Sequence, residues 1–417
     1  MERFEIGTMS FGPYGIARAG GKTILIPEVA PGDVVEAEVV AARRDYTIAR
    51  PVQLVQPGPD RREALCRYRP QCGGCDWQQI HYSAQVRIKA DLLVAEFRRS
   101  FGVELDPVGL VEPATTEFAY RSRVRLKVSA EGSIGYHQLG SNRLVPIAEC
   151  PVAGIDLKPA ASLASALGKR CDEIEAVKAG DHEVLVATLK RPLDKRDLAL
   201  ARQMVDADDH RVAGIVMRGG DQRTVVGRAT ITVEAEDGCL IEGEADRFSQ
   251  VNPEQNRKLV AHVMASAGIA PNDVVLDLFC GAGNLSLPAA RRGAVVTGVD
   301  ADELAIAAAR ENAIRMKLKQ AQFIAMAAAD TAQFLQRAKY RPTVVTLDPP
   351  RTGALPLMDV IAKLKPQRII YVSCDVATLV RDLAVLTKDA YRIGRVAGFD
   401  FFPNTHHVEV VAEALLT

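Results

Sequence analysis

The last third of the chain alternates short apolar runs with Ala-rich segments of helical spacing. The apolar runs are Val274–Leu278, Val295–Val299, Val344–Leu347 and Ile369–Val372. Uninterrupted runs of this length are typical of parallel strands that are covered on both faces, and the helices between them supply the crossovers. Residues 246–417 are therefore predicted to form a doubly wound α/β domain built on a parallel sheet.

The first part of the chain, residues 1–57, shows another pattern. Short β-like runs such as Val34–Val40 and Val52–Val55 alternate with Gly-rich turns. Frequent turns between short strands predict a small all-β barrel of about five strands. The segment Pro57-Gly58-Pro59 predicts a linker after this barrel.

Residues 58–245 predict a third unit that is mainly β and contains one long helix. Apolar residues at helical spacing over Tyr82–Phe101, followed by Gly102, predict that helix. The clearest strand of this unit is Tyr120–Val128. Alternate residues of a strand share one face, and here one face carries four cations: Arg121, Arg123, Arg125 and Lys127.

Two interpretations of this cationic face are open. A solvated sheet face is the ordinary explanation of an alternating strand. Four like charges repel one another, however, and no acidic residue stands between them in the sequence. We therefore favour contact with the phosphates of RNA or DNA.

Composition and charge narrow the class of protein. At roughly 150 residues per domain, 417 residues suggest about two to four domains, and 48% hydrophobic residues exclude a disordered chain. Lys+Arg equals Asp+Glu at 52 each, so a polyanionic partner needs a local basic patch. No apolar run is long enough to span a membrane, and the N-terminus lacks a signal-peptide pattern. We expect a cytoplasmic protein with reduced cysteines and no membrane partner.

A glycine turn follows the first strand of the α/β domain. Gly281 and Gly283 in this turn let a ligand approach the backbone, and the next strand ends at Asp300, whose carboxylate can accept hydrogen bonds from both hydroxyls of a ribose. Because position 286 is Ser, the Gly-x-Gly-x-x-Gly fingerprint of dinucleotide sites is incomplete. S-adenosylmethionine, which has a ribose and no phosphate, suits the turn better.

A later strand ends in Asp348-Pro349-Pro350-Arg351, where two prolines stiffen the loop that carries the Asp. Each of these three elements alone is a weak signal, since glycine turns and Asp-Pro-Pro turns also occur for structural reasons. Because the glycine turn, Asp300 and the Asp-Pro-Pro segment follow one another in the order expected for such a site, they together predict a Rossmann-like methyltransferase.

Two reactive groups are predicted at the same edge of the sheet. Cys374 follows the strand Arg368–Val372, and Glu409 follows a Pro-containing turn. Taken separately, Cys374 would be explained as a small side chain buried in the core, and Glu409 as a solvent-exposed acid. Methylation of nitrogen or oxygen needs neither group, but carbon 5 of a pyrimidine reacts only after a thiolate has added to carbon 6, and a base must then remove the carbon-5 proton. His406 and His407 are adjacent in the expected strand, where they would point apart, so we expect no shared metal between them.

Three cysteines stand close together as Cys66-x5-Cys72-x2-Cys75, and Cys150 completes a set of four. In a reducing compartment such a group indicates a metal site rather than disulfides. Zinc and a [4Fe–4S] cluster are both compatible with four thiolates, and the spacing alone does not distinguish them.

These residues together resemble the bacterial RNA uridine-5-methyltransferases, and among them the branch that acts on 23S ribosomal RNA. The resemblance covers nearly the whole chain. It implies a TRAM domain over residues 1–57, a [4Fe–4S] cluster, the helix Tyr82–Phe101 packed on the catalytic domain, and a monomer that binds RNA. It assigns the cluster to Cys66, Cys72, Cys75 and Cys150, the S-adenosylmethionine site to Gln250, Phe279, Asn284, Asp300 and Asp348, the nucleophile to Cys374 and the base to Glu409.

The sequence also departs from this family at three positions. Asp375 and Val376 follow Cys374 where the family usually has Asn and Pro, and Asn404 replaces a common His. The negative charge of Asp375 is expected to raise the pKa of the neighbouring thiol.

Two alternative functions are weighed against this one. An RNA or DNA amino-methyltransferase usually carries an aromatic residue after the two prolines, where this chain has Arg351. A non-catalytic RNA-binding protein with a methyltransferase fold need not retain Asp348, Cys374 and Glu409 together.

Overall fold

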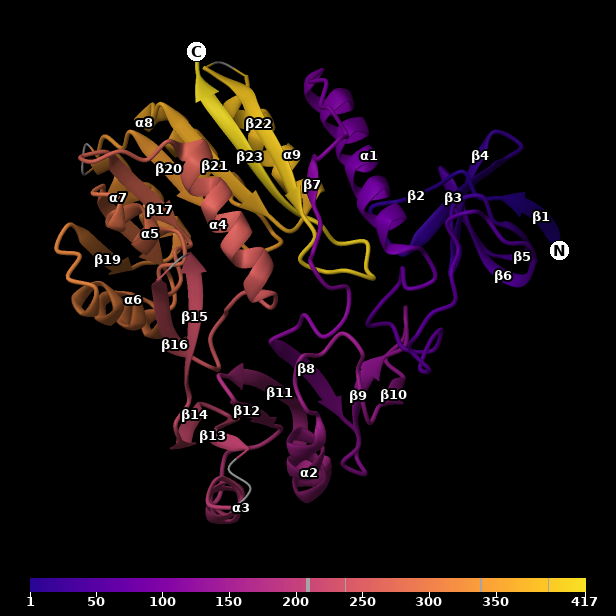
Figure 1. Cartoon of the computed structure of the whole chain (residues 1–417), viewed down its shortest axis with the longest axis horizontal. Helices are drawn as coiled ribbons and strands as arrows, with labels where there is room; N and C mark the ends of the chain where they lie inside the picture. Colours follow the sequence, from indigo (N-terminus) through magenta and orange to yellow (C-terminus); the bar gives the residue numbers. More distant parts are fainter. Residues whose placement is uncertain (208–210, 237, 338–339, 389) are drawn as a thin grey trace.

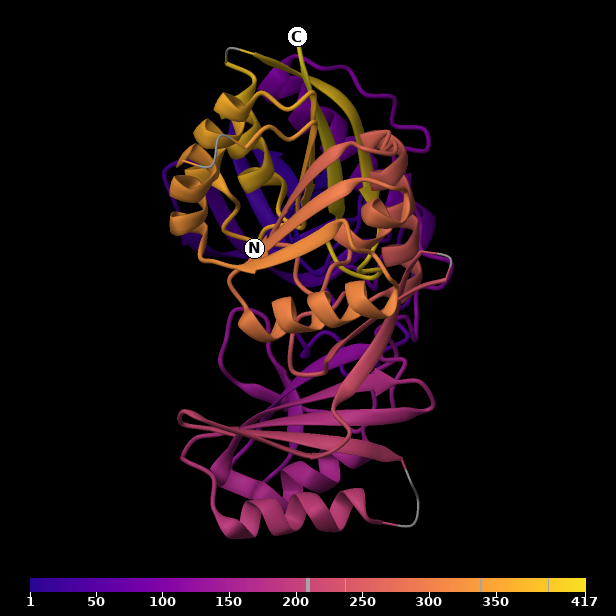
Figure 2. The ribbon, with the colours of Figure 1, turned by 90° about the vertical axis from the view of Figure 1, so that its left-hand side faces the viewer.

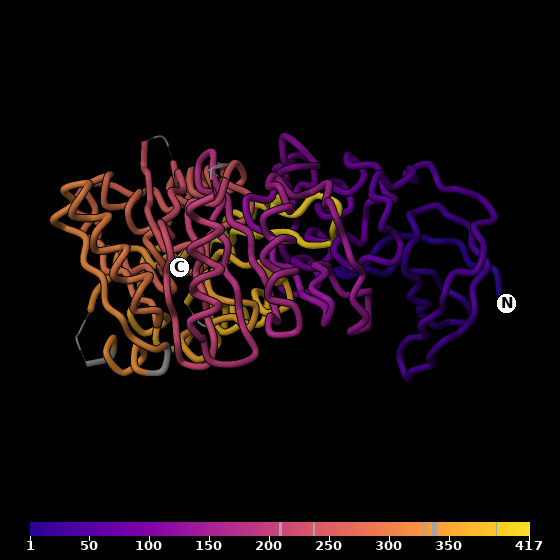
Figure 3. Tube along the Cα trace, turned by 90° about the horizontal axis from the view of Figure 1, so that it is seen from below, coloured from indigo at the N-terminus to yellow at the C-terminus, as the bar shows by residue number. Residues whose placement is uncertain are grey.

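In the part of the chain that the structure describes, three larger β-sheets have six, seven and eight strands, and a fourth sheet is a two-stranded hairpin (Figure 1). The structure is a computed structural model that describes residues 1–207, 211–236, 238–337, 340–388 and 390–417, with the backbone alone at 328–329 and 336–337. In Figure 1 the N-terminal sheet lies on the right, the catalytic sheet on the upper left, and the central sheet below them. Seen from below, the N-terminal part stands at one end of the molecule (Figure 3).

The N-terminal sheet has six strands in the order β1-β5-β6-β4-β3-β2. The sequence predicted about five, and the additional strand is the two-residue β2. Alternate residues point inward to a small core that includes Phe4, Ile26 and Val35. The strands are β1 Glu2–Glu5, β2 Thr8–Met9, β3 Tyr14–Ala19, β4 Lys22–Pro27, β5 Val34–Ala42 and β6 Tyr46–Gln56.

The predicted linker after β6 is held against the N-terminal sheet by one buried carboxylate. Asp33 Oδ1 accepts hydrogen bonds from the Gly58 amide at 2.9 Å and from Arg61 Nε at 2.9 Å. Arg61 Nη2 also lies 2.7 Å from Asp33 Oδ2. This stretch is therefore a fixed connection, which its proline and glycine content did not indicate.

The central sheet has seven strands in the order β10-β9-β8-β11-β12-β13-β14. Two helices, α2 Lys158–Leu167 and α3 Lys195–Val205, cover the face that is turned away from the catalytic sheet (Figure 2). A short 3-10 helix, η1 Gly168–Arg170, follows α2. The strands are β8 Arg123–Val128, β9 Ile134–His137, β10 Leu144–Pro146, β11 Cys171–Ala179, β12 His182–Leu189, β13 Val212–Gly219 and β14 Gln222–Gly227.

The catalytic sheet has eight strands in the order β19-β18-β17-β20-β21-β23-β22-β7. Strands β17 to β21 pair in parallel, as their apolar runs predicted, while β23 runs antiparallel to both β21 and β22. The strands are β7 Val111–Glu112, β17 Val274–Leu278, β18 Val295–Asp300, β19 Ala321–Ala325, β20 Val344–Leu347, β21 Arg368–Ser373, β22 Tyr391–Phe399 and β23 Glu409–Leu416. The helices of this part are α4 Pro253–Ala267, α5 Ser286–Arg291, α6 Glu303–Arg315, α7 Ala328–Arg337, α8 Leu355–Leu364 and α9 Val376–Leu386. In the part of the chain that the structure describes, no helix is long and apolar enough to span a membrane.

Helix α1 spans Tyr82–Phe101, the residues expected from the sequence, and lies between the N-terminal and catalytic sheets (Figure 1). Leu93 and Phe97 on this helix belong to the core of the catalytic sheet, whereas Ile88 packs with Met9 of the N-terminal sheet. Two faces of one helix thus join two parts of the protein.

A hairpin that the sequence grouped with the central unit also packs against the catalytic helices, while its Ile231 lies in one core cluster with Val177 and Val216 of the central sheet. It consists of β15 Thr230–Glu236 and β16 Cys239–Glu244. Ala235 and Ile241 are buried in the same core as Leu259 of α4. Its strand-like sequence does not show which sheet or helix covers it.

Candidate active site

The carboxyl ends of β17, β18, β20 and β21 meet at one edge of the catalytic sheet and present the predicted cofactor residues. Phe279 opens the turn after β17 with a φ of 60°, in the left-handed region that bulky residues seldom adopt. Asp300 Oδ2 accepts a hydrogen bond from the Gly281 amide at 2.9 Å. The carboxylate at the end of β18 therefore holds the glycine turn in place.

Asn284 is fixed by a second asparagine that the sequence analysis missed. Asn284 Nδ2 donates to Asn256 Oδ1 at 2.9 Å, and Asn256 Nδ2 donates to Asn284 Oδ1 at 3.0 Å. Asn256 lies in the first part of α4 and is fully buried. Nothing near residue 256 in the sequence signals this pairing, because it depends on how α4 packs against the turn.

Gln250 and Asp348 come together although 98 residues separate them. Gln250 Nε2 donates to Asp348 Oδ2 at 3.4 Å. Burial raises the pKa of Asp348 to about 7, the charge of Asp277 adds to the rise, and the hydrogen bond from Gln250 opposes it. The site therefore contains a buried acid whose charged form is disfavoured by its surroundings and favoured by Gln250.

Cys374 and Glu409 lie at the same edge, next to Arg351. Burial raises the pKa of the Cys374 thiol to about 11, the charge of Glu409 raises it further, and the Arg351 guanidinium lowers it. Glu409, the first residue of β23, is only 3% exposed. Its pKa is raised well above the usual range by burial and then by Asp348, while Arg351 again opposes the rise. The structure thus brings a thiol, two carboxylates and one cation together.

Arg351 is a site residue whose role the sequence analysis overlooked. It served there only to disfavour an amino-methyltransferase. In the structure its Nη2 also lies 3.4 Å from His407 Nε2. The sequence could have indicated this role, because Arg351 directly follows the two prolines that stiffen the loop after Asp348.

The rise in the pKa of Cys374 that was expected from Asp375 has other causes. The Asp375 carboxylate accepts a hydrogen bond from the Thr378 amide at 2.9 Å and caps the N-terminus of α9. The pKa of Cys374 is raised as expected, but burial and Glu409 contribute most. Asp375 at this position stabilises a helix.

Asn404, which departs from the family pattern, anchors the turn before Glu409. It is buried at a φ of 68°, a conformation that asparagine tolerates better than most residues. Its amide donates to Gln85 Oε1 at 2.7 Å, and its Oδ1 accepts from Arg62 Nη2 at 2.7 Å. The Trp77 amide donates to the Asn404 carbonyl at 3.0 Å. Three distant segments therefore hold this turn.

The two adjacent histidines lie closer together than expected. Their ring centroids are 4.0 Å apart, because they occupy a turn and not a strand. The prediction that they point apart was wrong. His406 contacts the Asp76 carboxylate through Nδ1 and through its amide at 3.0 Å. Since Asp76 follows Cys75, the turn before Glu409 is also fastened to the cysteine loop.

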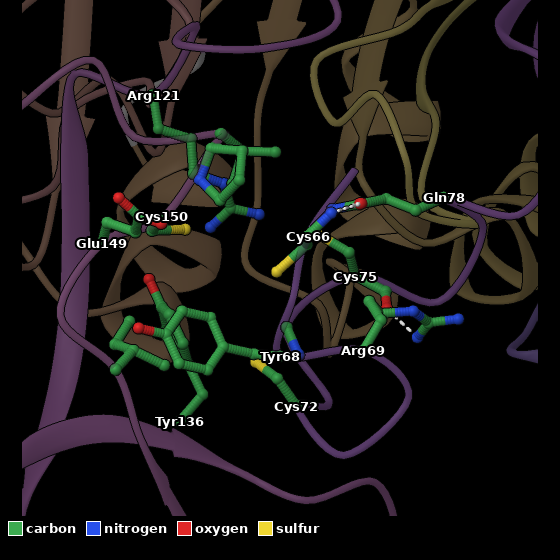
Figure 4. Close-up of a pocket in the computed structure, with 14 residues that line it drawn as sticks. Cys66, Tyr68, Arg69, Cys72, Cys75, Gln78, Arg121, Tyr136, Glu149 and Cys150 are labelled. Atoms are coloured by element: carbon green, nitrogen blue, oxygen red, sulfur yellow. Dashed lines mark hydrogen bonds between the residues drawn. The ribbon is translucent and has the colours of Figure 1, made fainter. Parts of the chain in front are cut away.

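The four clustered cysteines line one cavity of about 230 Å³ (Figure 4). The sulfurs of Cys66, Cys72 and Cys150 point toward a common space in Figure 4. Burial raises the pKa of Cys75 to about 12 and also raises the pKa of Cys72 and Cys150. Among the described residues, no three His, Cys, Asp or Glu side chains are grouped closely enough to hold one metal ion.

The prediction that the cations of β8 face phosphates was wrong for Arg123, and it stays a prediction for Arg125 and Lys127, whose side chains remain 64% and 38% exposed. Arg123 is buried, lies 3.4 Å from Glu175, and donates to the Arg247 carbonyl at 2.6 Å. Lys127 Nζ lies 3.0 Å from both Asp172 and Glu173, and Arg125 lies 3.4 Å from Glu173. The matching acids come from the neighbouring β11, and the sequence of β8 does not show which strand pairs with it. Arg121 alone precedes β8 and lines the cysteine cavity.

The sheet order, with antiparallel β23 between β21 and β22, and the carboxylates at neighbouring strand ends define a class I methyltransferase. The predicted fold class is confirmed. The chain belongs to the tRNA (uracil-5-)-methyltransferase family, whose family model matches residues 156–414.

Several relatives resemble the chain over nearly its whole length. It is 32% identical to the 23S rRNA (uracil(1939)-C(5))-methyltransferase RlmD of Pectobacterium atrosepticum, with 99% of this chain and 93% of the relative covered. It is also 32% identical to an uncharacterized RNA methyltransferase of Thermotoga maritima, with 98% of each chain covered. The crystal structure of the Pyrococcus abyssi tRNA (uracil-54, C5)-methyltransferase in complex with S-adenosyl-L-homocysteine matches with a TM-score of 0.77 at 24% identity, and 99% of both chains is covered. This last similarity shows the shared fold.

Proposed function

We propose that the protein transfers the methyl group of S-adenosylmethionine to carbon 5 of a uridine in RNA, with 23S ribosomal RNA as the substrate. The proposal is carried by the gathering of Cys374, Glu409, Asp348 and Arg351 at the strand ends beside the glycine turn. A nitrogen or oxygen methyltransferase has no use for a thiol and a buried base together. The names of the full-length relatives support this substrate class.

The residues divide the reaction between them. The Cys374 thiolate adds to carbon 6, and the enolate that forms attacks the methyl group through carbon 5, so that S-adenosylhomocysteine leaves. Glu409 then takes the carbon-5 proton, and the bond between sulfur and carbon 6 breaks. Arg351 favours the thiolate, because its positive charge lowers the pKa of Cys374. Gln250, Phe279, Asn284, Asp300 and Asp348 bind the methyl donor.

This function is tested by mapping 5-methyluridine in RNA. Purified protein with S-adenosylmethionine should introduce 5-methyluridine at one position of unmodified 23S ribosomal RNA, and cells that lack the gene should lose that modification. Methylation of a base nitrogen would favour the amino-methyltransferase. Binding of RNA without binding of S-adenosylmethionine would favour the non-catalytic alternative.

We also propose that the cysteine cavity holds a [4Fe–4S] cluster rather than zinc. Zinc binds thiolates at about 2.3 Å, so four zinc ligands must lie close together. The four thiols here are spread around a cavity, and they are not grouped for one ion among the described residues. Cys66, Cys72, Cys75 and Cys150 would hold the cluster, which supplies a rigid link between the loop that contains three of them and the segment that contains Cys150. We assign it no redox step.

Anaerobically purified protein is therefore expected to be brown and to contain about four iron and four sulfide per chain. Cys72→Ala should lose most of this iron because it removes one ligand. Cys171→Ala is the matched control, since Cys171 is also buried but lies in β11 outside the cavity. One zinc and no iron in the wild type would contradict the assignment.

A further inference from the structure

A second cavity, of about 270 Å³, lies beside the segment that carries Gln250. It is lined by the chain before β8, by Lys178 of β11 and by the start of α4. The Ser122 amide and hydroxyl both bind the Val251 carbonyl, at 2.8 and 3.1 Å, and Asn252 lines the cavity. The cavity therefore adjoins the proposed cofactor site without being part of it.

The charges around this cavity are not balanced within the protein. Lys178 is exposed and makes no side-chain hydrogen bond or ion pair with any described residue. Arg121 reaches the Tyr120 hydroxyl at 3.4 Å and lies over the Phe402 ring, at 5.6 Å from its centroid, with no described acid as an ion-pair partner. Arg257 adds a third cation, which lies 3.3 Å from Glu234.

The acid on the cavity wall is already engaged. Glu254 accepts a hydrogen bond from Thr115 and lies 3.4 Å from Lys258 Nζ. Glu183 of β12 stands opposite Lys178 in the sheet, but its carboxylate accepts a hydrogen bond from the Asp156 amide at 2.9 Å. Neither Lys178 nor Arg121 forms an ion pair with an acid among the described residues. The N-terminus of the 15-residue α4 adds its positive end to this side. An anion from outside the chain would supply a counter-charge on the side of this cavity.

We infer that this cavity holds a backbone phosphate of the RNA substrate next to the target uridine. The inference rests on the proposed function for the identity of the RNA. Phosphate contacts position a nucleic acid and contribute a salt-dependent part of its affinity. Arg121 also joins this cavity to the cysteine cavity, because it lines both. This site uses Arg121, whose phosphate contact the sequence predicted, together with Lys178, which the sequence did not suggest.

The inference is tested with Lys178→Ala in the full-length protein. RNA binding should weaken about fivefold, and the slope of log affinity against log salt should fall by about 0.7 to 1. S-adenosylmethionine binding should not change. Lys178→Gln, which keeps the length of the side chain, should give the same loss, and Lys178→Arg should restore binding.

Lys169→Ala is the matched control, because Lys169 is also an exposed lysine but lies in η1, after α2. An unchanged salt slope for both Lys178→Ala and Lys178→Gln, or an equal loss for Lys169→Ala, would overturn the inference. Binding is measured without catalysis, so the two proposals fail separately. A Lys178-dependent slope in a protein that makes no 5-methyluridine would support the phosphate site and reject the proposed function.

Discussion

Cys374→Ala is expected to bind RNA and S-adenosylmethionine and yet to transfer no methyl group. Without the thiol nothing adds to carbon 6, and carbon 5 stays too weak a nucleophile to attack the methyl group. By analogy with other nucleophile deletions, the rate should fall by a factor of about 10⁴ or more. Neither the fold nor the proposed binding contacts depend on this half-buried side chain at the end of β21.

The measurement is transfer of a labelled methyl group, together with the affinities for RNA and S-adenosylmethionine. Cys171→Ala, which removes a buried thiol far from the strand ends, should retain wild-type activity. Normal turnover by Cys374→Ala would reject the thiol mechanism and favour the amino-methyltransferase alternative.

The reactivity of the same thiol should depend steeply on pH. With a pKa of about 11, set mainly by burial and by Glu409, Cys374 is protonated at neutral pH. The thiolate fraction rises about tenfold per pH unit below the pKa. The rate of Cys374 alkylation in the free protein should therefore rise about tenfold per unit between about pH 7 and pH 10, and a rate that levels off near pH 9, the ordinary pKa of a thiol, would show that the pKa is not raised.

Local patterns predicted the elements of this fold better than their partners. The apolar run Val274–Leu278 and the helix Tyr82–Phe101 occur at the predicted residues because a short pattern determines each of them. The acids that face the cations of β8 were not expected, because they lie on β11, about 50 residues further along the chain. The β15–β16 hairpin was assigned to the central unit alone for the same reason: its further packing against α4 and α6 depends on segments that its own sequence does not show.

The residues of the candidate site also divide into those that a local pattern predicts and those that depend on distant partners. Glycine turns and strand ends suggested where Asp300, Asp348 and Cys374 belong, since parallel strands bring their carboxyl ends to one edge. Asn256 and Arg62 could not be suggested in this way, because each acts through hydrogen bonds to a residue that is distant in the sequence.

The turn that leads into Glu409 connects the cysteine loop to the proposed chemistry. The Trp77 amide, the Asp76 carboxylate and the Tyr120 hydroxyl all bind the backbone of residues 403–406. Each of these groups lies within two residues of Cys75 or next to Arg121, which line the cysteine cavity. A structural cluster there would help to hold the base of the reaction in position, without taking part in any chemical step.

Glu409→Gln is expected to trap the RNA on the protein. Glutamine has nearly the same shape as glutamate but cannot accept the carbon-5 proton, so addition and methyl transfer occur once and the final elimination is slowed by about 10³-fold or more. Burial and the charge of Asp348 hold the pKa of Glu409 far above its usual range, which makes its carboxylate a strong base once it has ionised. In the wild type, release of the product should therefore accelerate as pH rises.

The trapped species is measured on a denaturing gel with labelled RNA, where Glu409→Gln should give a band shifted by the mass of the protein. The double variant Cys374→Ala, Glu409→Gln should give no such band, because the bond to carbon 6 requires the thiol. Glu413→Gln is the matched control: Glu413 is another buried carboxylate of β23, but it binds the Arg395 amide at 3.1 Å and has no role in the proposed chemistry. Rapid turnover by Glu409→Gln without a covalent band would assign proton removal to another group. Asp348, whose pKa is raised to about 7, would then be the next residue to substitute.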